Sequence, residues 1–116
     1  MSMLSYVPAT IANGASLSGE TDLYPGILVG IWMPATWTAA SLTFQVLSPD
    51  GSTWLELYTY PGAELTLTVG AGQFLAVDPA QWKGITAVKV RSGTAASPVN
   101  QGQQSIVNLV TRQVVA

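Results

Sequence analysis

The sequence predicts an all-β protein, an antiparallel two-layer β-sandwich of about eight or nine strands. Three observations predict it: runs of alternating apolar and polar residues, Gly and Pro turns between them, and no apolar repeat of helical period long enough to matter. The 116 residues fit one domain, 1–116, because domains cluster around ~100 to 150 residues. A hydrophobic content of 48% excludes intrinsic disorder on compositional grounds.

The first part of the chain contains two weak strand candidates. Residues 1–11 predict an extended arm or an edge strand, because Pro8 lacks the N–H group that a central strand would donate. Residues 17–23 predict a polar strand, which ends at the turn Tyr24-Pro25-Gly26.

The next stretch, residues 27–33, is apolar at both parities and predicts a strand buried on both faces. One face must meet the core, and the other needs a loop, the arm or another subunit. Residues 34–40 are too short for an independent helix and predict a loop with at most one helical turn. Within this loop, Trp37 is expected to plug one end of the sandwich.

The clearest strand pair is a β-hairpin over residues 41–60, with the turn Pro49-Asp50-Gly51 between its two alternating runs. The residues expected on its core face are Leu42, Phe44, Val46, Leu55 and Leu57. The residues on the other face of the second run are Trp54, Glu56, Tyr58 and Tyr60. We expect that second face to meet a partner, a ligand or a loop.

The rest of the chain predicts further strands and one helical turn. The strand candidates are residues 64–69, 74–77, 88–91 and 105–111. Asp78-Pro79-Ala80-Gln81 predicts the turn of helix, because Asp is a good N-cap and Pro suits the first helical position. Val88 and Val90 are expected in the core, with Lys89 and Arg91 pointing outward from the strand. The loop 92–103 is long for a compact domain, which indicates a role.

Charge and composition exclude several classes of partner. The formal net charge is −2 and the four basic residues are scattered, so the chain lacks the basic surface of a nucleic-acid-binding protein. With no Cys, disulfides and thiolate metal sites are excluded. The start of the chain lacks a basic signal-peptide region, and the longest apolar run, residues 27–35, is far shorter than the ~20 residues of a membrane-spanning helix. We expect no nucleic acid, no membrane and no export signal.

The residues also fail to supply a catalytic constellation. Without His or Cys, a serine nucleophile lacks its usual base. Lys83 and Lys89 are expected to be solvated rather than paired with a serine, and the acidic spot Glu20-Thr21-Asp22 to be a solvated loop rather than a calcium site. We therefore expect no enzyme activity, no catalytic residues, and neither a cofactor nor a metal.

Low charge and aromatic content are the remaining signals. Charged residues make up 9% of the chain against a usual ~25%. Either small polar residues fill the solvent positions, as in many sandwiches, or much of the surface is buried between subunits. The aromatic residues could stack on sugars, or the tryptophans could be core and end-plug residues. The candidate contacts to a partner or ligand are Trp32, Trp54, Tyr58 and Tyr60.

A first resemblance concerns the middle of the chain. The hairpin 42–54, with Asp50-Gly51 and Trp54, and the later strand 85–91 resemble the galactose-binding-like (discoidin-type) jelly roll. In that family such a hairpin precedes a strand that ends in an arginine, here Arg91. The calcium and sugar residues of the family do not map onto this chain.

A closer resemblance covers most of the chain from about Ile11 onward. The segments that carry it are 28–45, Asp78-Pro79, 91–94 and 98–101. They resemble small proteins encoded among the head and neck genes of tailed bacteriophages and prophages. This implies a virion component made in the host cytoplasm, a capsid decoration (cement) protein or a head-fibre protein on the capsid surface. The implied partner is the major capsid protein or another virion protein.

Several features together predict a symmetric homo-oligomer, because closed symmetry removes exposed apolar surface. These features are the strand 27–33, the low charge, the arm 1–11 and the loop 92–103. A trimer is favoured, since capsid lattices offer threefold positions, with docking on the capsid through the arm or the loop. The alternative function is a carbohydrate-binding β-sandwich module that binds host-surface glycans from a head fibre or tail.

Overall fold

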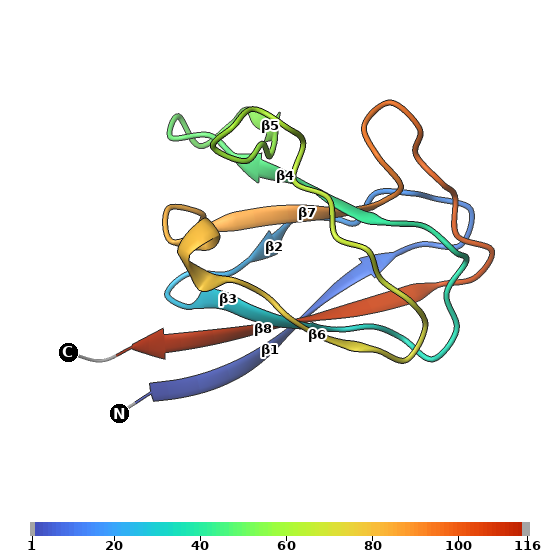
Figure 1. Ribbon diagram of the computed structural model, residues 1–116, viewed down its shortest axis with the longest axis horizontal. Helices are drawn as coiled ribbons and strands as arrows, with labels where there is room; N and C mark the ends of the chain where they lie inside the picture. Colours follow the sequence, from blue (N-terminus) through green and yellow to red (C-terminus); the bar gives the residue numbers. More distant parts are fainter. Residues whose placement is uncertain (1, 115–116) are drawn as a thin grey trace.

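Two antiparallel sheets of four strands each form a sandwich (Figure 1), which confirms the predicted all-β two-layer fold. The computed structural model describes residues 2–114, with side chains from Leu4 to Gln113; Met1, where the predicted arm begins, and residues 115–116 lie outside the described residues. The elements are β1 (Ser2–Ile11), β2 (Thr21–Asp22), β3 (Ile27–Trp32), β4 (Leu42–Leu47), β5 (Trp54–Glu56), β6 (Phe74–Ala76), the 3₁₀ helix η1 (Pro79–Trp82), β7 (Ala87–Ser92) and β8 (Ser105–Val114).

The first sheet has the strand order β1-β8-β3-β6. Strand β1 pairs with β8 along its whole length, from Ser2 opposite Val114 to Ile11 opposite Ser105. Of the two alternatives for the start of the chain, the described residues form an edge strand. Ala9 and Ile11 belong to the core, so this strand is not free to act as a docking arm.

The second sheet has the order β2-β7-β4-β5, and its strands β4 and β5 form the predicted hairpin. In the turn, the Asp50 carboxylate accepts hydrogen bonds from the backbone N–H groups of Ser52 and Thr53 at 2.8 and 3.0 Å. The hydrogen bond from the Ser48 hydroxyl is the main cause that holds the pKa of Asp50 well below its ordinary range, and these backbone bonds add to it. Gly51 takes the positive φ, 78°, that the turn requires.

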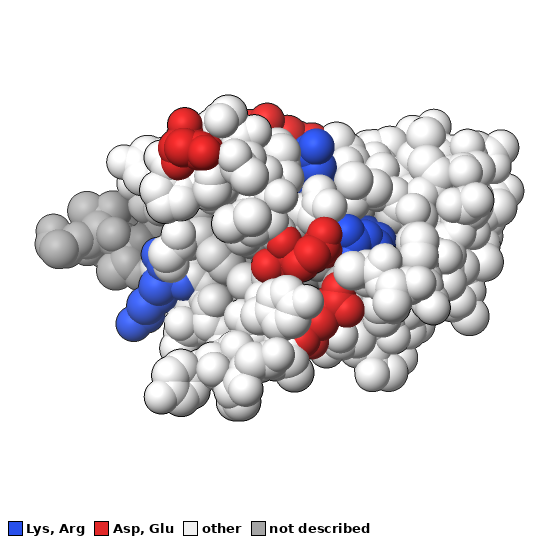
Figure 2. All heavy atoms as spheres, turned by 90° about the horizontal axis from the view of Figure 1, so that it is seen from above, with Lys and Arg blue, Asp and Glu red and all other residues white. Residues whose placement is uncertain are grey.

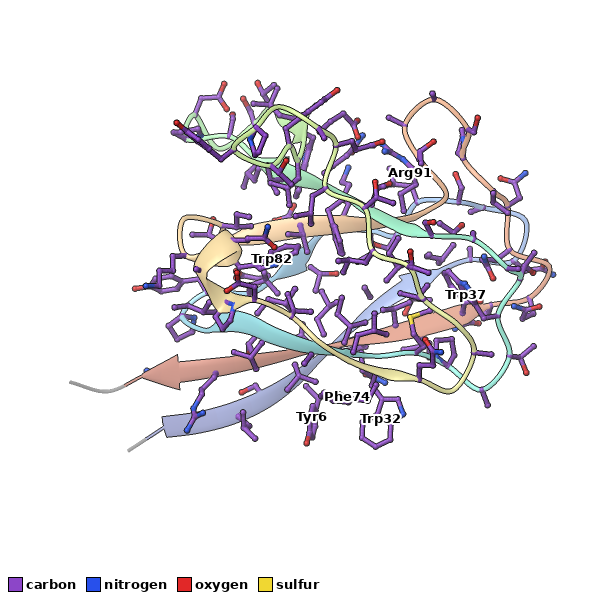
Figure 3. All side chains as sticks on the ribbon, in the orientation of Figure 1. Tyr6, Trp32, Trp37, Phe74, Trp82 and Arg91 are labelled. Carbon is purple, nitrogen blue, oxygen red and sulfur yellow. The ribbon has the colours of Figure 1, made fainter. Side chains whose placement is uncertain are left out.

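The core lies between the sheets, and most of its predicted members are there. Leu42, Phe44, Val88 and Val90 are fully buried. The Phe44 ring meets Trp82 edge to face, with ring centroids 4.9 Å apart. Trp37 packs against the core at one end of the sandwich (Figure 3), as predicted. The other buried hydrophobic residues of this cluster are Ala9, Ile11, Leu23, Leu28, Ile31, Met33, Leu65, Val77, Val107 and Leu109.

One core prediction in the hairpin is wrong: Leu55 is 51% exposed. It lies opposite Val46, which is partly buried and packs against the core. However, β5 is the edge strand of its sheet and lies away from the first sheet (Figure 1), so its inward face extends past the core. Leu57 is partly buried and packs against the core as predicted.

Two other predicted strands are shorter or absent. In the segment 17–23 only β2 forms. The hydroxyl of Ser18, in place of a backbone carbonyl, takes one of its two hydrogen bonds with β7, which interrupts the ladder. The Ser18 N–H donates to the Val90 carbonyl, and the Ser18 Oγ accepts from the Val90 N–H, both at 2.8 Å. The segment 64–69 is no strand, and it holds only isolated pairings, Leu67 with Leu42 and Glu64 with Tyr58.

The helical turn and the long loop each have a local cause. In η1, the Asp78 carboxylate caps the N–H of Ala80 at 3.0 Å with Pro79 in the first turn, as predicted, whereas residues 34–40 form no helical turn. The loop 92–103 is held by Gln101, whose amide accepts from the Thr38 N–H at 2.8 Å and donates to the Thr38 carbonyl at 3.0 Å. The C-terminal end of this loop is therefore anchored to the loop 34–40.

Candidate interaction surface

The outer face of the first sheet is apolar and exposed. Five of its large side chains are between 41% and 63% exposed: Leu4, Tyr6, Trp32, Phe74 and Ile106. We call these five residues the aromatic face. Figure 3 shows Tyr6, Trp32 and Phe74 pointing away from the rest of the molecule. Because a sheet packed on one side normally presents polar residues on the other, this face departs from the ordinary pattern.

The strand register brings the aromatic face together from four strands. One row across the sheet consists of Pro8, Asn108, Trp32 and Phe74. Tyr6 lies in the next row, opposite Val110. Leu4 opposite Arg112 marks one end of the face, and Thr10 opposite Ile106 marks the other. Along the strand direction, Tyr6 and Trp32 therefore lie between the two ends of the face.

A β-bulge explains why Trp32 points outward. Leu28 and Ile31 are both fully buried, although strict alternation would place residues three apart on opposite faces. The pairing of β3 with β8 shifts register between Leu28 and Gly30, and this bulge resets the alternation. Gly30 and Trp32 then share the outer face. The predicted burial of this strand on both faces is thus wrong at Trp32, which is 53% exposed.

Phe74 holds Trp32 in place from the neighbouring strand. The Phe74 ring lies over Gly30, where an added Cβ atom would come within 2.6 Å of its Cζ. The same ring meets Trp32 at a centroid distance of 5.5 Å and an interplanar angle of 89°. A side chain at this position would have to displace the Phe74 ring. The exposed indole is therefore braced on one side by a second aromatic ring.

A hollow of about 250 Å³ opens on this face, lined by Tyr6, Trp32 and Asn108. It lies over the central strand β8, between rings contributed by β1 and β3. Typical small-molecule sites enclose ~300 to 1,000 Å³, so this hollow is closer in size to one protruding side chain.

Charge is nearly absent from the first sheet. Of the four basic and six acidic residues in the chain, only Arg112 lies in the described strands β1, β8, β3 and β6. Figure 2 shows the opposite side of the molecule, which is the top in Figure 1, where β4 and β5 of the second sheet lie. Acidic and basic side chains are scattered over that side. Interface cores are depleted in charged residues and enriched in aromatic ones, so the aromatic face has the composition of a protein contact.

Three of the four predicted contact residues lie elsewhere, on or after β5. Trp54 is half-buried, with the Lys89 ammonium 4.7 Å above its ring centroid. Tyr58 and Tyr60 are exposed, as predicted, and line a hollow of about 340 Å³ with Leu57, Thr59, Pro61, Leu65, Ala80 and Gln81. Trp32 belongs to the other sheet, so the structure does not bring the four residues into one site.

The outer face of the second sheet carries an ion-pair cluster. Arg91 points outward from the sheet as predicted, and its side chain is buried there by other parts of the chain. Its guanidinium makes two hydrogen bonds to Glu56, at 2.7 and 2.9 Å, and lies 3.5 Å from Glu64. The bond from Arg91 is the main cause that lowers the pKa of the Glu56 carboxyl. The cluster joins β7 to β5 and to the segment that follows β5.

Four residues of the aromatic face were missed by the sequence prediction: Leu4, Tyr6, Phe74 and Ile106. A signal for two of them is present in β1. Leu4 and Tyr6 alternate with Ser5, whereas Ala9 and Ile11 alternate with Thr10. The apolar parity switches within one strand, which indicates one apolar half on each face of the sheet.

Neither a metal site nor a membrane-spanning helix finds support within residues 2–114. No group of three or more His, Cys, Asp or Glu residues there is arranged to hold a metal ion. No helix in the described chain has the length and apolar character needed to cross a membrane. No protein-family model matches the sequence, and no curated protein is significantly similar to it.

Proposed function

We propose that this protein is a structural subunit of a tailed-bacteriophage particle, a capsid decoration (cement) protein on the surface of the head. The observation that carries the proposal is the aromatic face. Exposed apolar patches of this kind on soluble domains mark contact sites, since water otherwise disfavours them. A protein built to bind other subunits accounts for such a face.

The proposed location is supported by the sequence resemblance to phage head and neck proteins. Three of the four segments that carry this resemblance meet in one part of the fold. Gln101, from the segment 98–101, bonds to Thr38 in the segment 28–45, and the Val99 N–H donates to the Ser92 carbonyl at 2.9 Å. These segments build the fold rather than the aromatic face, apart from Trp32. The proposed partners are therefore the major capsid protein or another virion protein, together with further copies of this chain.

The test is to find the chain in assembled particles. Particles of a phage or induced prophage that encodes the protein are purified, analysed by mass spectrometry and imaged by cryo-electron microscopy, beside particles from a deletion strain. We expect the chain at a high, regular copy number and a density on the wild-type head that the deletion removes. Absence of the chain from purified particles would contradict the proposal.

A second candidate function, glycan binding, is favoured by the hollow beside Tyr58 and Tyr60. Two exposed phenol rings can stack on sugar C–H faces, and Gln81 offers an amide to sugar hydroxyls. A glycan array with the wild-type chain and Tyr60→Ala tests this function. Binding to a defined glycan that Tyr60→Ala abolishes and Tyr6→Ala retains would establish it. An array without signal at high micromolar protein would exclude it.

A further inference from the structure

We propose that the aromatic face is the contact through which two copies of this chain pair, face to face, about a twofold axis. The inference rests on the proposed function only in treating this face as an assembly surface. It names the occupant, a second copy, and the symmetry of the contact. Its geometry comes from the outer faces of β1, β8, β3 and β6.

The size of the face fits a dimer contact. A large aromatic side chain covers ~150 to 250 Å². Three aromatic rings that are more than half exposed, with Leu4 and Ile106, therefore offer on the order of 500 Å² of apolar surface. Specific interfaces bury about 800 Å² on each partner, and the surrounding Pro8, Thr10 and Asn108 bring this face into that range.

The distribution of charge favours a second copy as the occupant. Each chain carries a net charge of −2, so two copies repel weakly. All six acidic residues lie outside the described strands of the first sheet, so pairing through this sheet brings no carboxylate from its strands into the contact. Arg112 lies at the Leu4 end of the face, and a twofold axis that passes near Asn108 in the plane of the contact and across the strands places it against the partner's uncharged opposite end. A strongly acidic partner would find no central cation here.

The shape of the face is suited to self-pairing. The hollow over Asn108 lies next to the two side chains that protrude most from the middle of the sheet, Tyr6 and Trp32. In an isologous contact the same patch meets itself, so each protruding ring can enter the hollow of the other copy. A threefold arrangement would require the aromatic face to meet a different surface of the next chain, whereas a twofold pairing lets it meet a copy of itself.

The face is also organised before it binds. The Phe74 ring lies over Gly30 and meets Trp32 edge to face, and this contact restricts the rotamers of the indole before pairing. Rigid Tyr and Trp side chains at the centre of a contact are the residues that contribute most to binding. We therefore expect a single substitution at Tyr6 to have a large effect.

The experiment is sedimentation equilibrium of the purified full chain from 1 to 100 µM, with Tyr6→Glu as the variant and Tyr60→Glu as the matched control. Both tyrosines are exposed, and Tyr60 lies on the segment after β5, so neither change removes a core residue. We expect a dimer for the wild type and for Tyr60→Glu, and at least tenfold weaker pairing for Tyr6→Glu. A circular dichroism melt confirms that both variants are folded.

Three results would overturn the pairing: a wild-type monomer at 100 µM, a trimer, or a dimer that Tyr6→Glu leaves intact. As a second measurement, the dimer constant should change less than threefold between 0.05 and 0.5 M NaCl, because an uncharged contact has little to screen. A strong salt dependence would contradict an apolar contact. A monomer found on particles overturns the pairing alone, whereas a dimer absent from particles overturns the proposed function alone.

Discussion

On the outer face of the second sheet, Thr43 and Arg91 are buried, whereas on the outer face of the first sheet Tyr6 and Trp32 are more than half exposed. The second sheet is covered by its own chain. The Thr43 hydroxyl donates to the Gly93 carbonyl at 2.7 Å, and the carboxylate of Glu64, which contacts Arg91, accepts from the Ala95 N–H at 3.0 Å. No described segment covers the aromatic face in this way.

The comparison shows which sheet has its outer face covered by the chain itself and which does not. The polar groups Thr43 and Arg91 on the outer face of the second sheet find their partners within the chain. The first sheet presents apolar rings whose burial would be favourable, at ~25 cal/mol per Å², and the chain supplies no cover. Any cover for these rings would be another molecule, which is the physical basis of both proposals.

The largest effect is expected in the core beneath both faces. Phe44 is fully buried and packs on Trp82, so Phe44→Ala leaves a cavity and should destabilise the chain by ~3 to 5 kcal/mol. Urea unfolding followed by tryptophan fluorescence measures this. A loss below ~1 kcal/mol would mean that the hairpin does not form the centre of the core.

The covered face should be the next most sensitive. Arg91→Met removes the cation between Glu56 and Glu64 and should cost about 2 to 3 kcal/mol, less than the ~3 to 5 of a fully buried pair because the Glu56 side chain keeps 29% exposure. Lys89→Met, on the same strand, is the matched control and should cost about 1 kcal/mol or less, since it loses only a cation–π contact between two half-buried side chains. An equal loss of stability in the two variants would show that the ion pairs of Arg91 do not stabilise the fold.

Stability should also depend on pH through Glu56. Its pKa is lowered in the folded chain, mainly by Arg91, from an ordinary value of 4.5. A lowered pKa means that the carboxylate stabilises the fold above about pH 4.5 and that this contribution is lost as the pH falls through the folded value. Melting temperatures of wild type and Glu56→Gln between pH 3 and 7 test this. We expect a shallower acid dependence in the variant, and parallel curves would contradict the role of Glu56.

The uncovered face should tolerate substitution with the smallest effect on stability. Trp32→Ser is expected to change the free energy of unfolding by less than ~1 kcal/mol at concentrations where the chain is monomeric, because the indole is already half in water. The same urea experiment measures it beside Phe44→Ala. A loss above ~2 kcal/mol would mean that Trp32 serves the fold rather than a partner.

The hairpin and η1 could be predicted from sequence because their signals are local. Alternation and a Pro-Asp-Gly turn specify β4 and β5, and Asp78-Pro79 specifies the start of a helix. The failure at Leu55 has a non-local cause, since its alternation is correct and only the tertiary position of β5 leaves it exposed. The alternation of β7 likewise placed Arg91 on the correct face. Its burial could not be predicted, because it depends on segments far along the chain.

The aromatic face was harder to predict because it depends on register. Trp32 points outward only through the bulge after Leu28, which leaves no local sequence signal that we recognise. Phe74 joins the face only because β6 pairs with β3, a contact between residues more than 40 apart in the chain. Tyr6 was predictable in principle from the switch of apolar parity in β1.

The central claim is that another protein surface covers the aromatic face in the assembled state. Hydroxyl-radical footprinting with mass spectrometry, on purified particles and on the dilute free chain, tests it most directly because the radicals label exposed Trp and Tyr. We predict that Tyr6 and Trp32 are protected several-fold in particles, relative to Tyr60 as the internal reference. Equal labelling of Trp32 in the two samples, in particles that contain the chain, would contradict the account.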